Sequence, residues 1–191
     1  MSDPTVIDAA QAEADTRRWL ERAVIGLNLC PFAKAVHVKG QIHYLTYLDT
    51  HEGRLIDALL AEARALVALD AEVRDTTLLI VPHALADFLD FNDFTERAER
   101  KLARAGFDGV LQLASFHPHF QFAGTEADDI TNATNRAPYP TLHLLREDSM
   151  DRAVEAFPEA EAIFERNIET LEALGPDGWT ALDVGPGSAT P

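Results

Sequence analysis

Hydrophobic residues recur along this chain with two spacings, one typical of amphipathic helices and the other of buried strands. Trp19, Ala23 and Leu27 repeat at helical spacing, whereas residues 76–81 (TTLLIV) are apolar on both faces, as in a central strand. The pattern predicts helices over residues 8–29, 55–67, 93–105, 149–156 and 158–175, and strands over 36–48, 76–81, 110–116 and 142–145. The last of these strands has a pattern that could also open a helix.

Alternation of helices and strands predicts an α/β fold with a mostly parallel sheet of about four strands and helices packed on it. Residues 118–140 show little periodicity and are expected to form a long loop, and two helices follow near the C-terminus. Residues 1–175 are expected to form a single α/β domain. Residues 176–191 are rich in proline and glycine, which predicts a flexible C-terminal tail.

The balance of charge narrows the range of partners. The 191 residues include 16 Lys and Arg against 32 Asp and Glu, a formal net charge of −16, which would repel nucleic acid and anionic membrane surfaces. The single cysteine excludes an intrachain disulfide, and the acidic N-terminus lacks the pattern of a signal peptide. No apolar run approaches the length of a membrane span. We therefore expect a cytoplasmic protein whose partner is a small molecule, with no nucleic acid and no membrane, and an oligomeric state that the sequence leaves undetermined.

The segment GVLQLASFHPHFQFAG (109–124) changes from a buried strand to an alternation of polar and aromatic residues. If it stays extended, His117, His119 and Gln121 lie on one side. Two imidazoles placed in this way could bind a divalent metal, or His117 alone could act as an acid or base near neutral pH. A third metal ligand would come from Asp128, Asp129 or His143. Alternatively, His117 only hydrogen-bonds the backbone and His119 is exposed.

The segment NRAPYPTLHLLRE (135–147) contains two prolines that stiffen the backbone next to Arg136. Arg136 and Arg146 are candidates for gripping a carboxylate or phosphate in a bidentate manner, although Arg146 could instead pair with Glu147 or Asp148. Because ligands of α/β sheets gather beyond the carboxyl ends of the strands, this loop and His117 are expected to share a pocket. Gln121, Asn132, Asn135 and Glu147 would orient the substrate there.

Cys30 follows the first predicted helix and precedes Pro31. The carboxyl end of a helix raises the pKa of a thiol, which weakens a nucleophilic role. A packing role beside Phe32 is favoured over nucleophilic catalysis or haem ligation through the Cys-Pro pair.

Four motifs together carry a resemblance to a known family: LNLCPFA (27–33), TTLLIVPHALADFLDF (76–91), FHPHFQF (116–122) and NRAPYPTLHLLRE (135–147). In this order they resemble a bacterial family catalogued only as Domain of Unknown Function 1415. In that family the position of His119 often carries another residue, such as an acid, which makes His117 the better candidate. The resemblance implies a free-standing bacterial cytoplasmic protein and supplies no activity, cofactor or catalytic residue.

Three functions remain in view. The first is a small-molecule enzyme in which His117 is the acid, base or metal ligand, Arg136 holds an anionic substrate and Glu147 supports the imidazole. The second is a non-catalytic regulatory protein that binds a metabolite or a metal. A purely structural interaction domain would leave the long polar loop unexplained.

Overall fold

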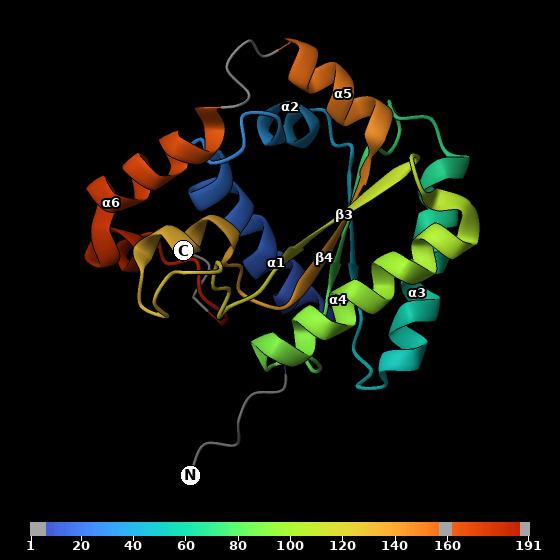
Figure 1. Cartoon of the computed structure of the whole chain (residues 1–191), viewed down its shortest axis with the longest axis horizontal. Helices are drawn as coiled ribbons and strands as arrows, with labels where there is room; N and C mark the ends of the chain where they lie inside the picture. The colour runs from blue at the N-terminus through green and yellow to red at the C-terminus, as the bar shows by residue number, and fades with distance from the viewer. Residues whose placement is uncertain (1–6, 157–161, 188–191) are drawn as a thin grey trace.

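Three layers make up the molecule, with a four-stranded sheet between two groups of helices (Figure 1). The computed structural model describes residues 7–156 and 162–187. The strands are β1 (Ile42–Thr46), β2 (Thr76–Ile80), β3 (Leu111–Phe116) and β4 (Thr141–Arg146). The α-helices are α1 (Ala9–Trp19), α2 (Ala33–Val38), α3 (Glu52–Ala68), α4 (Phe88–Leu102), α5 (Glu147–Ala156) and α6 (Ile163–Ala181). Shorter helical segments are η1 (Leu20–Ile25), η2 (Ala103–Phe107) and η3 (Ile130–Asn135).

The α/β class is confirmed, but the prediction of a mostly parallel sheet is wrong. The strand order is β1-β2-β4-β3, and β4 runs antiparallel to both of its neighbours, so that only β1 and β2 form a parallel pair. The physical reason lies in the connections: helices α3 and α4 carry the chain back between strands of like direction, whereas β3 and β4 are joined without a crossover helix. The sheet is therefore mixed.

Several boundaries of helices and strands also differ from the predicted ones. The predicted strand 36–48 is split, because residues 33–38 form α2 and the chain reverses at Gly40, whose φ of 69° suits glycine. The apolar run at 142–145, which could have opened a helix, is strand β4. The predicted start of the last helix at Pro158 lies outside the described residues. Gly175, the predicted end, has a non-helical φ of 67° that kinks α6, and a second helical piece follows from Pro176 to Ala181.

Each face of the sheet packs against its own set of helices. One face carries Leu79, Leu142 and Leu144 and packs against the apolar stripes of α3 and α4. The other face carries Tyr44, Leu78 and Ile80 and packs against α1 and η1. Period-two alternation along β2 sends successive residues to opposite faces, which explains why the whole strand is buried. Within the described residues, no helix has both the length and the apolar character needed to span a membrane.

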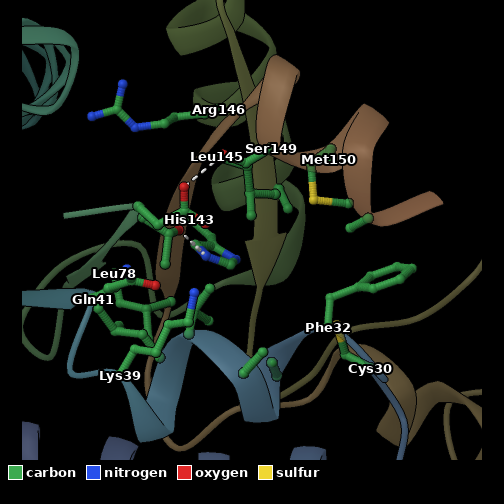
Figure 2. Close-up of a pocket in the computed structure, with 18 of the residues that line it drawn as sticks. Cys30, Phe32, Lys39, Gln41, Leu78, His143, Leu145, Arg146, Ser149 and Met150 are labelled. Carbon is green, nitrogen blue, oxygen red and sulfur yellow. Dashed lines mark hydrogen bonds between the residues drawn. The ribbon is translucent and has the colours of Figure 1, made fainter. Parts of the chain in front are cut away.

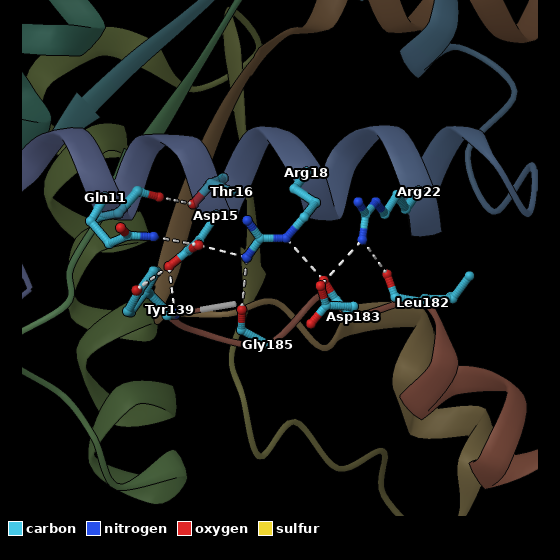
Figure 3. Close-up of polar contacts among 11 residues, drawn as sticks. Gln11, Asp15, Thr16, Arg18, Arg22, Tyr139, Leu182, Asp183 and Gly185 are labelled. Carbon is cyan, nitrogen blue, oxygen red and sulfur yellow. Dashed lines mark hydrogen bonds and ion pairs between the residues drawn. The ribbon is translucent and has the colours of Figure 1, made fainter. Parts of the chain in front are cut away.

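A buried carboxylate on α1 holds the C-terminal segment against the body of the protein (Figure 3). Asp15 is fully buried and accepts hydrogen bonds from Gln11, Arg18, Tyr139 and the backbone N–H of Gly187, at 2.6 to 2.8 Å. Burial alone would raise the pKa of Asp15, but the hydrogen bonds from these groups outweigh it and lower the pKa.

The side chains of Arg18 and Arg22 extend this contact along the same helix. Arg18 donates to the carbonyl oxygens of Asp183 and Gly185, and Arg22 donates to that of Leu182 (Figure 3). Residues 176–187 therefore differ from the irregular tail that their composition predicts, since half of them are helical and the rest are fastened to α1. The flexibility of the final residues stays a prediction.

We expect the substitution Asp15→Asn to lower the free energy of unfolding by about 3 kcal/mol, because it leaves Arg18 as a buried cation without its counter-ion. Urea denaturation monitored by circular dichroism measures the change. Glu13→Gln is the matched control, since Glu13 forms an exposed pair with Arg17 on the same helix and its loss should cost less than about 1 kcal/mol. Equal effects of the two substitutions would contradict a central role for the buried pair.

Candidate functional site

A cavity of about 600 Å³ lies on the face of the sheet that α1, α2 and α5 cover (Figure 2). Its size is within the range of pockets that bind metabolite-sized molecules. The floor is formed by side chains from all four strands: Ile42, Thr76, Leu78, Ala114, Phe116, His143 and Leu145. Large apolar side chains from α1, η1, α5 and the 30–32 loop form much of the wall: Trp19, Leu20, Val24, Phe32 and Met150.

Small side chains explain why this part of the sheet face is hollow. Alanines line the cavity from the sheet, from α2 and α5, and from the loop that precedes β2: Ala33, Ala35, Ala71, Ala114, Ala153 and Ala156. Interiors are normally filled to the density of organic crystals, so a cluster of alanines facing a sheet leaves space that longer side chains would occupy. The hollow therefore follows from the choice of residues on three elements.

His143 stands in the middle of the cavity floor. It lies on β4 and is paired across the sheet with Leu78 on one side and Ala114 on the other. Its Nε2 is 2.5 Å from Oγ1 of Thr76, and the same hydroxyl donates to the carbonyl oxygen of Leu144 at 2.6 Å (Figure 2). Burial lowers the pKa of His143 to about 4, so the ring is neutral at pH 7.

Cys30 lines the same cavity from the loop between η1 and α2. Burial raises the pKa of its thiol, although hydrogen bonds from the backbone N–H groups of Phe32 and Ala33 oppose the effect in part. The thiol is therefore protonated at neutral pH and contributes to the wall as a small apolar group. This agrees with the packing role that the sequence favours.

Charged residues mark the open side of the cavity. Lys39 and Glu72 lie 3.7 Å apart as an exposed ion pair, and the exposed Arg152 donates to Oγ of Ser149. Ser149 in turn donates to Asp75 at 2.6 Å. The cavity thus has a polar rim, while its depth is mainly apolar, with the imidazole of His143, the hydroxyl of Thr76 and the buried amide of Gln41 as its polar groups.

The structure does not bring His117 and Arg136 together at a cavity. His117 is fully buried between the rings of Phe88 and Phe91, whose centroids lie 5.4 and 5.1 Å from its own. Its Nε2 donates to the carbonyl oxygen of Leu85, and its Nδ1 accepts from the backbone N–H of His119. Both ring nitrogens are occupied, and burial lowers the pKa of His117, so the geometry matches the alternative in which it only hydrogen-bonds the backbone.

Arg136 donates to two carbonyl oxygens within the long loop, those of Phe120 and Ala127, instead of facing a ligand. The fully buried Asn132 accepts from Phe122 and Thr125 and donates to Glu126.

Gln121 and Asn135 also bond backbone oxygens, those of Thr125 and Ser115. The polar residues predicted to bind substrate therefore hold the 117–140 segment in shape, because a loop packed against the body must satisfy its own backbone groups.

Arg146, predicted to hold an anionic substrate, borders the cavity, but its guanidinium is already engaged. It donates to the carbonyl oxygens of Leu66, Leu69 and Arg74, which fastens the end of α3 to β4. The alternative, an ion pair of Arg146 with Glu147 or Asp148, is not found among the ion pairs of the described residues. Glu147 begins α5, and its backbone N–H donates to Val110.

The expected metal site at His117 and His119 has no geometric support. His119 is exposed, and Nδ1 of His117 is used by its backbone. In residues 7–156 and 162–187, no three His, Cys, Asp or Glu side chains come together as a set of metal ligands.

Sequence reasoning named His143 only as a third metal ligand and missed its place in a cavity. One signal was present: in TLHLLR the imidazole interrupts an otherwise apolar strand at a position in phase with Thr141 and Leu145. The site was also expected at the wrong end of the strands. Because β4 is reversed, its carboxyl end lies beside the amino ends of β1 and β2, and the cavity forms there.

Comparison with known families matches residues 11–181 to the family described as Protein of unknown function (DUF1415). The chain belongs to this family, which confirms the resemblance seen in its motifs. Neither the curated proteins nor the solved structures contain a match to the chain.

We expect Arg136→Gln to lower the free energy of unfolding by about 1 kcal/mol, because the part-buried carbonyl oxygen of Phe120 and the exposed one of Ala127 lose their charged donor. Urea denaturation gives the value. Arg104→Gln, at an exposed position in η2, is the control and should change it by less than about 0.5 kcal/mol. An unchanged stability in Arg136→Gln would instead favour a guanidinium held ready for a ligand.

The lowered pKa of His143 makes stability depend on pH. Between an unfolded value of 6.5 and the folded value of about 4, the unfolded chain binds a proton that the folded protein does not. Stability should therefore rise with pH in this window, and His143 alone should account for a loss of about 3 kcal/mol between pH 7 and pH 4. His117 acts in the same direction, so the difference between wild type and His143→Gln isolates the contribution. Parallel stability curves for the two proteins would show that the ring titrates normally.

Proposed function

We propose that this member of the DUF1415 family binds a small, mainly apolar molecule in the cavity between the sheet and helices α2 and α5. The observation that carries the proposal is the cavity itself, about 600 Å³ in volume, with apolar walls and one imidazole on its floor. Pockets for small molecules commonly combine apolar walls with a few placed polar groups. Transfer of a ligand's apolar surface from water into such a cavity supplies the driving force for binding.

The protonation state of His143 favours binding over acid–base catalysis. A catalytic base works best with a pKa near the operating pH, whereas the pKa of this ring is about 4. Placing a proton on it at pH 7 would cost about 4 kcal/mol. The ring is better suited to accept a hydrogen bond than to take up a proton, which supports the non-catalytic alternative among the functions considered.

An enzyme that uses His117 and Arg136 on an anionic substrate receives less support. Both ring nitrogens of His117 have partners within the fold, and the Arg136 guanidinium bonds two carbonyl oxygens. We retain a cytoplasmic location and a small-molecule partner as part of the proposal, supported by the single cysteine and the net charge of −16.

The test is the binding of N-phenyl-1-naphthylamine, an uncharged dye whose fluorescence increases in apolar surroundings. Wild-type protein should bind it saturably, and Ala114→Phe should weaken binding at least about tenfold because the new ring fills the floor beside His143. Ala61→Phe is the control, since it adds the same ring at an exposed position on α3, across the sheet. Ala153→Phe fills the cavity from α5 if Ala114→Phe does not fold.

Alkylation of Cys30 provides an independent measure of occupancy. It is the chain's one cysteine and lines the cavity, so reaction with iodoacetamide reports on this site. Saturating dye should slow the reaction in wild type. Dye binding that survives both filling substitutions, or leaves the thiol unprotected, would place the dye elsewhere and refute the proposal.

A further inference from the structure

The hydrogen bonds around Thr76 determine which nitrogen of His143 carries a proton. Oγ1 of Thr76 is 2.6 Å from the carbonyl oxygen of Leu144, a separation at which two oxygens without a proton between them would repel each other. The single hydroxyl proton of Thr76 therefore points to Leu144. Since the hydroxyl has no second proton, the 2.5 Å contact with His143 requires that Nε2 carry the hydrogen.

Nδ1 of the neutral ring is consequently a fixed hydrogen-bond acceptor. It has no partner among the described residues, and it is not sealed off, because the one buried side-chain oxygen or nitrogen without a partner among these residues is the hydroxyl of Tyr44. The ring lines the cavity, so Nδ1 is open to whatever occupies it (Figure 2). An acceptor in apolar surroundings that lacks a donor is unfavourable, and it therefore selects among ligands.

We propose that His143 is the specificity-determining residue of the cavity and selects ligands with an uncharged hydrogen-bond donor, an O–H or N–H, placed against Nδ1. The inference rests on the proposed function and adds the chemical class of the ligand. Thr76 is a positioning residue, because it acts by fixing the tautomer. A ligand with only an ether or carbonyl oxygen at this point would oppose its lone pair to that of Nδ1.

The uncharged form of the donor follows from the surroundings of the ring. Leu78, Ala114 and Phe116 are its neighbours on the floor, and the Phe116 ring centroid lies 6.1 Å from its own. Moving an ammonium group into such an environment costs much more than moving a hydroxyl. The acidic groups of Glu72 and Asp75 lie at the rim, where Lys39 and Ser149 already engage them.

Two isomers that differ only in the donor provide the test. 1-Octanol and heptyl methyl ether have the same atoms and nearly the same apolar surface, but only the alcohol can donate. Calorimetric titration of wild-type protein should give an affinity about tenfold higher for the alcohol. The octylammonium ion should bind more weakly than the alcohol.

Three variants locate the source of the preference. In His143→Phe the alcohol and the ether should bind equally, because the acceptor is gone. In Thr76→Val the ring remains but can exchange tautomers, so the ratio of the affinities for the alcohol and the ether should fall towards one. The ¹⁵N chemical shifts of the imidazole should change from those of a single Nε2–H form to those of a mixture of tautomers. His143→Asn can place an amide oxygen near the position of Nδ1 and should restore part of the preference.

The outcomes separate this inference from the proposed function. Equal affinities of the two isomers in wild type, a preference that persists in His143→Phe, or tighter binding of octylammonium would overturn the selection of a donor while leaving the cavity a binding site. If neither isomer binds, and the affinity for the dye is unchanged in Ala114→Phe, the proposed function itself is refuted. If His143→Phe does not fold, Thr76→Val tests the inference. An alcohol-to-ether affinity ratio equal to that of wild type in this variant would exclude selection by a fixed tautomer of His143.

Discussion

The position of β4, antiparallel between β2 and β3, is the constraint on which the candidate site depends. Its pairing with β2 places His143 beside Leu78 and within reach of Thr76, and its pairing with β3 places Ala114 on the other side. A parallel strand in the same place would carry its carboxyl end to the opposite edge of the sheet. The reversal of one strand thus creates a row of a leucine, a histidine and an alanine under the same cavity.

The long segment between β3 and β4 makes this reversal stable. Polar side chains that were expected to face a ligand instead bond the backbone of the segment, with Asn132 fully buried at its centre and Arg136 spanning it. His117 joins the segment to the loop before α4 through the carbonyl oxygen of Leu85. Hydrogen bonds of this kind are needed wherever irregular backbone is buried, and they account for the density of polar residues that made the segment resemble a site.

The two polar centres on the α1 face of the sheet have different chemistry. Around Asp15 every oxygen is paired, and the result is a rigid attachment of the C-terminal segment. Around His143 one nitrogen is paired and the other is open to a cavity. A fully satisfied group contributes to stability, whereas a partly satisfied one in an apolar hollow has binding capacity left for a ligand.

Local pattern determined much of the fold. The apolar stripes and turn residues of the sequence specified the α/β class, the strands at 76–81 and 110–116, and the helices on either side, because each depends on the spacing of neighbours along the chain. The family was also evident from the motifs. The sequence singled out residues whose side chains can bind or react, including Cys30, His117, Arg136 and Arg146. It could not distinguish a side chain that faces a cavity from one that donates to a carbonyl oxygen within the fold.

Tertiary structure alone decided the strand order, the direction of β4 and therefore the location of the site. These depend on contacts between residues far apart in the chain, such as Thr76 with His143 or Asp15 with Tyr139, and no local period encodes them. The hollow itself is a property of several elements at once, since each alanine is unremarkable in its own helix or strand. Only when these elements pack together on one face of the sheet do their alanines leave a volume that side chains do not fill.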